Sequence, residues 1–293
     1  MSSRALFLVN PRARRGSEGA DDIAGRLRGL GLEVVVETTT EPGRFGELIR
    51  RHRGAVDRVV VGGGDGTLNA AAQILAEEPL PLGIVPLGTA NNLARSLGVP
   101  SDVADACGAI AGGRRRRVDL GWVNGRYFCT TASLGLSVQI TEELSPEAKR
   151  RWGPLAYAWT AGRVMRRSHA FDADISWEGG SRRSRTVQIV VGNGRYYGAA
   201  LTVAEDARLD DARLDVYSLE VSHWWDLVKL APALKRGTHG RRSEVESMRA
   251  TAFDIRTRRP MPIDVDGELG VETPAHFRVV PAAMEVFVPE TEG

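Results

Sequence analysis

Short apolar runs alternate with helical patterns along roughly the first 120 of the 293 residues. Apolar runs bounded by turn residues predict strands, and apolar positions three and four apart predict helices. Strands alternating with helices indicate a mostly parallel sheet covered on both faces. The expected strands cover 5–9, 32–37, 58–61 and 82–85, and the expected helices cover 21–30, 44–51 and 69–76.

From about Asp119 the pattern changes to strand-like runs separated by turn residues, which predicts an antiparallel β-sandwich. Its expected strands cover 121–123, 127–131, 171–177, 186–191, 201–204, 214–219, 251–256, 263–265, 276–280 and 283–288, with helices at 146–167 and 222–236. We therefore expect an α/β nucleotide-binding domain over residues 1–120 and a β-sandwich domain over 121–282. Whether the last segment, 283–293, returns to the first domain stays open.

A glycine-rich segment follows the third expected strand. Residues 61–69, here called the glycine loop, have the sequence Val-Gly-Gly-Gly-Asp-Gly-Thr-Leu-Asn. Glycines let a backbone turn sharply and let an anion approach the N–H groups. A helix is expected next, and its N-terminus favours phosphate. Because a carboxylate beside phosphates commonly binds Mg²⁺, Asp65 adds a magnesium ion to the prediction.

A second loop follows the fourth expected strand. Residues 86–95, here called the second loop, contain Gly88, Thr89, Asn91 and Asn92. Ligands bind beyond the carboxyl ends of parallel strands, so both loops are expected to face one crevice. Thr89 or Asn91 can also serve simply as a helix N-cap, and the two interpretations are compatible.

Acidic residues alternate near the C-terminus at Asp264, Asp266 and Glu268. A continuous strand would place all three on one face. Carboxylates so close together need solvent, a cation or a shared proton. The alternative is a hairpin turn at Asp266-Gly267, because Asp-Gly is a frequent turn pair.

Composition narrows the function classes. The net charge of +2 gives no strong field for nucleic acid, so no nucleic-acid partner is expected. The two cysteines have neither metal-site nor redox spacing, which favours a reducing cytoplasm. No signal-peptide pattern and no apolar stretch near the roughly 20 residues of a membrane span is present. Any membrane contact is therefore expected to be peripheral.

The two loops, in this order and spacing, resemble the catalytic domain of the diacylglycerol kinase family, which includes soluble bacterial lipid kinases and the sphingosine and ceramide kinases. Further segments over almost the whole chain are similar to motifs of that family. They are Asn10-Pro11, 38–43, 131–135, 193–198, 210–216 and 264–268.

The resemblance implies an NAD-kinase- or diacylglycerol-kinase-like fold and an ATP-dependent lipid kinase. The most expected reaction converts diacylglycerol to phosphatidic acid, with ATP and Mg²⁺ bound in an interdomain cleft and the acceptor bound by residues 121–282. The residues implied in nucleotide binding are Asn10, Thr39, Gly63, Gly64, Asp65, Gly66, Thr67, Leu68, Asn69, Gly88, Thr89 and Asn92.

The resemblance also implies catalytic and metal residues. Glu268 is favoured as the base that takes the acceptor hydroxyl proton, Asp266 is the next candidate, and Asp65 supports the magnesium–phosphate network. A structural Mg²⁺ site is implied at Asp210-Asp211, and its expected ligands are the Asp211 carboxylate and the backbone carbonyls of Arg208 and Arg213. A plain acidic turn is the alternative.

Two departures keep other functions open. Asn92 stands where many members of that family carry aspartate, and Ala212 replaces a usual turn glycine, so a tighter or altered metal loop is expected. The alternatives are a kinase for a sphingoid base or phosphatidylglycerol, an NAD kinase, or an inactive nucleotide-binding regulator. We expect a lipid substrate and a cytoplasmic protein at the inner face of the membrane, with a homodimer left open.

Overall fold

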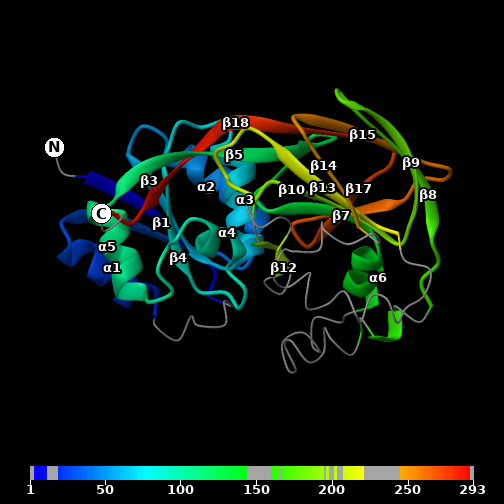
Figure 1. The fold of residues 1–293 in the computed structure, drawn as a ribbon. Coiled ribbons are helices and arrows are strands. Elements are labelled where there is room, and N and C mark those ends of the chain that lie inside the picture. Colours follow the sequence, from blue (N-terminus) through cyan, green and yellow to red (C-terminus); the bar gives the residue numbers. More distant parts are fainter. Residues whose placement is uncertain are drawn as a thin grey trace. The chain divides into compact units, whose positions relative to one another are not determined.

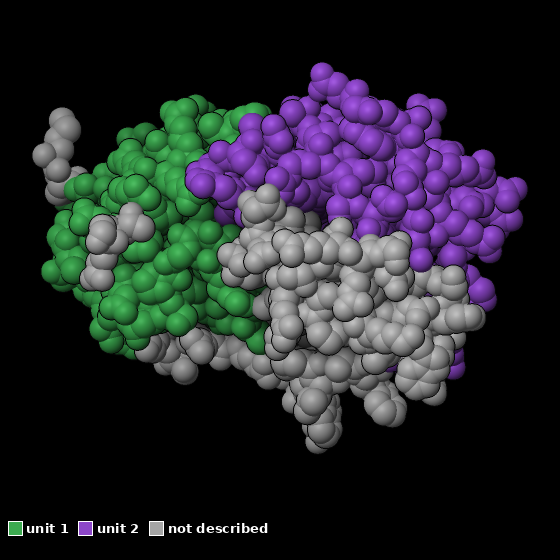
Figure 2. Space-filling view, viewed as in Figure 1, with its two compact units in different colours: residues 1–120, 280–293 green, residues 121–279 purple. Residues whose placement is uncertain are grey.

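The computed structural model describes residues 3–11, 19–143, 160, 162–164, 167–194, 196–197, 201–202, 207–220 and 245–290. The chain divides into two compact units, coloured separately in Figure 2. Unit 1 comprises residues 1–120 and 280–293, and unit 2 comprises residues 121–279. The two predicted helices at 146–167 and 222–236 lie largely or wholly outside the described residues.

Unit 1 is built around a parallel sheet (Figure 1). Its first four strands have the order β2-β1-β3-β4, and the end of the last strand, β18, pairs in parallel with β4. The strands are β1 (Ser3–Val9), β2 (Leu32–Thr38), β3 (Arg58–Gly63) and β4 (Leu82–Pro86). The helices are α1 (Ala20–Gly29), α2 (Phe45–Arg51) with a preceding 3₁₀ turn (Pro42–Arg44), α3 (Asp65–Leu75), α4 (Asn92–Ser96) and α5 (Val103–Gly112).

The central strands of unit 1 are buried, as expected for a sheet covered on both faces. All six residues of β3 and all five of β4 are buried. Helix α1 places Ile23 and Leu27 in the same cluster as Phe7 of β1 and Val60 of β3. The mostly parallel α/β prediction for the first domain is confirmed.

Unit 2 consists mainly of antiparallel strands. One sheet has the order β14-β13-β10-β7-β16-β17; the other contains β18, β15, β8 and β9, with β5 and β6 joined through β18. The bounds are β5 (Arg114–Val123), β6 (Arg126–Phe128), β7 (Thr131–Gly135), α6 (Leu136–Glu143), β8 (Phe171–Trp177), β9 (Gly180–Thr186), β10 (Gln188–Gly192), β11 (Tyr196–Tyr197), β12 (Leu201–Thr202), β13 (Leu214–Leu219), β14 (Val245–Ala250), β15 (Ala252–Thr257), β16 (Pro262–Val265), β17 (Glu268–Glu272) and β18 (Ala275–Val288).

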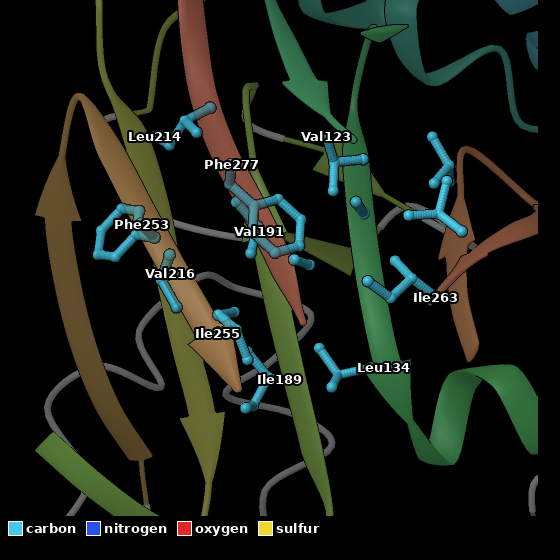
Figure 3. Close-up of a cluster of buried hydrophobic side chains, with 14 of the residues drawn as sticks. Val123, Leu134, Ile189, Val191, Leu214, Val216, Phe253, Ile255, Ile263 and Phe277 are labelled. Carbon is cyan, nitrogen blue, oxygen red and sulfur yellow. The ribbon is translucent and has the colours of Figure 1, made fainter. Parts of the chain in front are cut away.

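The core of unit 2 draws side chains from both sheets. Leu134 and Val191 come from β7 and β10, whereas Phe253, Ile255 and Phe277 come from β15 and β18 (Figure 3). Alternate residues of these strands face the cluster, which is the period-two pattern of a sandwich. The antiparallel prediction for the second domain is confirmed.

Two element boundaries differ from the sequence prediction. Helix α3 begins at Asp65 rather than at Asn69, so the second half of the glycine loop is helical. The two strands expected at 276–280 and 283–288 form one strand, β18, and Ala282 within it takes a positive φ of 50°. The Ala282 N–H donates to the Asp119 carboxylate at 2.8 Å, which supports this irregular point.

Candidate active site

The glycine loop lies at the carboxyl end of the parallel sheet, where three backbone hydrogen bonds hold the neighbouring strand ends together. Asn10 N–H donates to the Gly62 carbonyl at 3.2 Å, and Leu87 N–H donates to the Gly63 carbonyl at 3.0 Å. On the other side, Thr39 N–H donates to the Val9 carbonyl at 3.2 Å. The segments after β1, β2 and β4 are thereby joined to the end of β3 or to one another, at the edge where α/β sheets bind ligands.

The N-terminus of α3 offers an anion site. Its N-cap residue, Gly64, provides no side-chain cap, and the first backbone bond of the helix runs from Leu68 N–H to the Gly64 carbonyl. The N–H groups before Leu68 therefore precede the helical ladder, and such groups together with the helix dipole favour phosphate. A Cβ built on Gly66 meets nothing within 4 Å, so the backbone is open there.

The two loops approach each other through glycine. A Cβ on Gly88 would lie 2.5 Å from the Gly64 Cα, which is far inside van der Waals contact. The second loop is closed on itself, because Gly88 N–H donates to Asn91 Oδ1 and Asn91 Nδ2 donates to the Gly88 carbonyl, both at 3.0 Å. Asn91 takes the left-handed conformation that this closure needs, with φ 50°.

Asp65 links the glycine loop to the second loop. Its carboxylate accepts from Leu93 N–H at 3.3 Å and from Asn92 Nδ2 at 3.5 Å, so it faces the N-terminus of α4. Burial raises the pKa of Asp65 above the ordinary 3.8, and hydrogen bonds from the backbone of residues 91–93 oppose that shift. Of the two predicted caps, Asn91 occupies the N-cap position, but its side chain bonds to Gly88 and not to the helix.

Substitution of Gly88 by alanine should weaken ATP binding by about tenfold or more, because the new methyl group would force the second loop away from Gly64. The measurement is a titration of ATP binding by calorimetry. Gly108→Ala in α5 is the matched control, since a Cβ there meets nothing within 4 Å. Equal ATP affinities for the two variants would contradict the role given to the contact between the loops.

The other predicted nucleotide residues divide into two groups. Thr39 caps its own turn by accepting from Glu41 N–H at 3.1 Å. Thr67 packs against Gly63, where a Cβ would lie 2.5 Å from the threonine Cβ. The Leu68 side chain is fully buried in the core, and Asn69 is buried and accepts from Gln73 Nε2 at 3.0 Å. The structure thus gives the Leu68 side chain a packing role.

The acidic segment of unit 2 is a hairpin. Asp266 and Gly267 form the turn between β16 and β17, with φ of 50° and 90°, which fits a type I′ turn. The expectation of one continuous strand carrying three carboxylates on one face is therefore wrong. Asp264 pairs with Leu269, and Glu268 stands opposite Val265.

Asp266 is a hydrogen-bond acceptor inside unit 2. Its carboxylate accepts from the backbone N–H groups of Cys129 (2.6 Å), Thr130 (3.1 Å) and Thr131 (2.9 Å), and from the Thr130 hydroxyl at 2.5 Å. Burial raises the pKa of Asp266 above 3.8, and these four bonds oppose the rise. A carboxylate with both oxygens engaged in this way joins the hairpin turn to residues 129–131.

Of the three acidic side chains, Glu268 is the exposed one. Asp264 is buried and accepts from Gly267 N–H at 2.7 Å and from the Thr141 hydroxyl at 2.8 Å. The Glu268 side chain is 48% exposed and forms an ion pair with Arg126 at 2.8 Å. Glu268 is therefore the carboxylate of the hairpin that an outside hydroxyl can reach.

The acidic turn expected to bind a structural metal is closed by its own hydrogen bonds. Arg208 Nε donates to Asp210 Oδ1 at 3.0 Å, and Asp211 Oδ1 accepts from Arg213 N–H at 3.1 Å. Ala212 takes φ 54°, the conformation that a glycine would adopt easily. Within the described ranges no group of three or more His, Cys, Asp or Glu side chains is placed to hold a metal ion. The structural Mg²⁺ site at this turn stays a prediction.

Replacement of Ala212 by glycine should raise the free energy of unfolding by about 0.5–1 kcal/mol, because alanine is strained at positive φ. Urea denaturation measures the change. Ala252→Gly in β15 is the control, and it should lower the free energy of unfolding, since glycine weakens a regular strand. If both substitutions destabilise the protein equally, the strain at Ala212 is refuted.

Two residues around the hairpin escaped the sequence analysis. Arg126 follows an Asn-Gly pair, and that pair is a recognisable turn signal that could have placed it at the start of a strand. Thr130 carries no comparable signal, because its hydroxyl bonds to Asp266, which lies 136 residues away in the sequence.

Comparisons with known proteins cover nearly the whole chain. The family model of the diacylglycerol kinase catalytic domain matches residues 4–123, and that of the YegS C-terminal NAD kinase beta sandwich-like domain matches residues 130–288. A curated diacylglycerol kinase from Staphylococcus epidermidis is 28% identical over 295 residues, covering 99% of this chain and 93% of that protein. One from Staphylococcus aureus is 29% identical over 294 residues, with the same coverage.

Solved structures agree on the fold. A structure described as a diacylglycerol kinase from Bacillus anthracis has a TM-score of 0.76 and 21% identity, covering 98% of this chain and 97% of that chain. A second chain from that organism, provisionally named in the same way, has a TM-score of 0.81 and 23% identity, with coverages of 98% and 96%. At these identities the likeness concerns the fold alone.

Proposed function

Because the chain belongs to the diacylglycerol kinase family of lipid kinases, which transfer a phosphoryl group to an alcohol, we propose that it phosphorylates the free hydroxyl of diacylglycerol with ATP and Mg²⁺. The choice of diacylglycerol follows the names of the curated relatives. The observation that carries the nucleotide part is the uncapped N-terminus of α3 inside the glycine loop.

In this proposal, unit 1 supplies the phosphate cradle. The N–H groups at the start of α3 bind phosphate oxygens of ATP, and the open backbone at Gly66 lets them approach. Asp65 is the single carboxylate of the two loops, so it is the residue that would hold Mg²⁺ there. Kinase Mg²⁺ sites commonly use one or two carboxylates together with phosphates and water, and one carboxylate fits that arrangement. When bound, the ion neutralises phosphate charge.

Unit 2 supplies the proton acceptor. The lipid hydroxyl gives its proton to the Glu268 carboxylate while its oxygen forms a bond to the γ-phosphorus. The bond from the γ-phosphorus to the bridging oxygen breaks, and ADP leaves with that electron pair. The products are the phosphorylated lipid and ADP, and Glu268 later releases the proton to water. The exposure of Glu268 supports this role, since Asp264 and Asp266 are engaged in internal hydrogen bonds.

The lipid substrate implies work at a membrane surface. No helix in the described parts of the chain is long and apolar enough to cross a bilayer. We therefore include peripheral contact with the inner face of the cytoplasmic membrane in the proposal.

The test is transfer of labelled phosphate from [γ-³²P]ATP to a panel of acceptors. Vesicles or micelles carry diacylglycerol, sphingosine, ceramide or phosphatidylglycerol, and NAD is supplied in solution. The expected result is the highest kcat/KM with diacylglycerol and no product with NAD. Preferred labelling of another lipid would overturn the diacylglycerol assignment. Labelling of NAD, or of no acceptor while ATP still binds, would overturn lipid kinase activity for this chain.

A further inference from the structure

Arg126 is fixed by the chain that surrounds it. It opens β6 directly after the turn Asn124-Gly125, whose φ angles of 43° and 95° fit a tight type I′ hairpin. Val123 of β5 is its partner across the hairpin. Two-residue turns of this kind set the strand register strictly, so the position of the Arg126 backbone follows from the turn.

The turn is also anchored to the segment that follows β17. Asn124 Nδ2 donates to the carbonyls of Glu272 at 3.3 Å and Pro274 at 3.0 Å, and Asn124 Oδ1 accepts from His276 N–H at 3.0 Å. Three hydrogen bonds from one side chain therefore hold the β5–β6 hairpin against the end of β17. The start of β17, which carries Glu268, belongs to the same strand.

The guanidinium of Arg126 reaches two consecutive residues of that strand. Nη2 lies 2.8 Å from Glu268 Oε2, and Nη1 donates to the Leu269 carbonyl at 3.3 Å. A Cβ on Gly270 would lie 3.1 Å from Nη1, so the absence of a side chain there leaves room for the guanidinium. A planar group with two anchoring points fixes direction as well as distance.

The ion pair is poorly placed to serve stability. The side chains of Arg126 and Glu268 are 28% and 48% exposed, and ion pairs in contact with water contribute little to folding. Its geometric effect is larger, because a proton acceptor must lie within hydrogen-bond reach of the hydroxyl and small displacements reduce the rate strongly.

We propose that Arg126 is a positioning residue, which holds the Glu268 carboxylate in the orientation that receives the proton of the lipid hydroxyl. This inference rests on the proposed function, in which Glu268 is the base. Arg126 acts on the reaction through Glu268 and touches neither substrate.

The test compares kcat and KM of four variants with diacylglycerol and ATP. Arg126→Ala should lower kcat about 10- to 100-fold and leave the KM for ATP within twofold. Arg126→Lys should recover part of kcat, because an ammonium can pair with Glu268 but does not reproduce the fork. Arg278→Ala is the control: it removes an arginine of β18 that lies on Trp122, 4.6 Å from the ring centroid, and kcat should not change.

The fourth variant closes a double-mutant cycle. In a Glu268→Gln background, Arg126→Ala should lower kcat by less than twofold more, because the carboxylate to be positioned is gone. A further loss as large as in the wild type would overturn the proposal by showing that Arg126 acts independently of Glu268. Normal kcat in Arg126→Ala alone would also overturn it, with the proposed base intact. Normal kcat in Glu268→Gln alone would instead refute the assignment of the base.

Discussion

Exchange of Glu268 for glutamine should lower the kcat of lipid phosphorylation by about 10²- to 10⁴-fold, the usual contribution of a positioned general base. Glutamine has the same shape and can still accept from Arg126, but it cannot take up a proton at neutral pH. The side chain is half-exposed and touches no part of the glycine loop or the second loop in the described contacts, so ATP affinity and the unfolding midpoint should stay near wild type.

The measurement is steady-state phosphorylation of diacylglycerol, combined with ATP titration of the same preparations. Glu272→Gln is the matched control, since Glu272 is an exposed glutamate at the other end of β17. It should retain wild-type kcat. A Glu268→Gln enzyme with wild-type kcat would remove the proton acceptor from the mechanism, and an equal loss in Glu272→Gln would point to a general charge effect.

Removal of the Asp266 carboxylate should be the most damaging change for folding. Asp266→Ala leaves three backbone N–H groups and the Thr130 hydroxyl without the acceptor that they share. Unsatisfied buried donors cost roughly 1–3 kcal/mol each, and water entering the gap recovers part of this, so we expect a loss of about 3–5 kcal/mol. Urea denaturation followed by fluorescence gives the value.

Asp254→Ala provides the comparison, because the Asp254 side chain is 55% exposed and pairs with His276 on β15 and β18. Its loss should cost less than about 1 kcal/mol. If Asp266→Ala were as mild as Asp254→Ala, the clamp on residues 129–131 would have no energetic significance. The kcat of any Asp266 variant has to be compared at temperatures where it is fully folded.

The pH dependence of stability gives the same carboxylate a second test. Burial raises the folded-state pKa of Asp266 above 3.8, so the folded protein binds this proton more tightly than the unfolded chain. The stabilising contribution is complete below 3.8 and is lost as pH rises through the raised pKa. Asp266→Asn lacks this titration, so the difference in unfolding free energy between wild type and variant should shrink as pH rises through that window. A difference that grew with pH would contradict the direction of the shift.

The sequence pattern was informative where structure is local. The runs at 171–177 and 214–219 match β8 and β13 in full, because strand periodicity and flanking turn residues both lie within a short window. The start of α3 was missed because Gly66 and Thr67 have low helix propensity, and tertiary contacts of the glycine loop override it.

Long-range hydrogen bonding explains the errors in the site. Nothing near Asp266 in the sequence indicates that its acceptors will be filled by residues 129–131. Periodicity favoured a strand with three aligned carboxylates, whereas the Asp-Gly pair favoured a turn, and the turn prevailed. The contact of Gly64 with Gly88 was likewise beyond prediction, although the loops themselves were recognised.

Asn92 gives the contact between the two loops a particular character. An aspartate there would place a second negative charge against Asp65, whereas the amide of Asn92 donates to it. Together with the Gly88–Asn91 closure, this bond orders the second loop without a cation. The conformational entropy of that loop is then lost during folding, not when ATP binds. Such preorganisation leaves more of the interaction energy for nucleotide affinity.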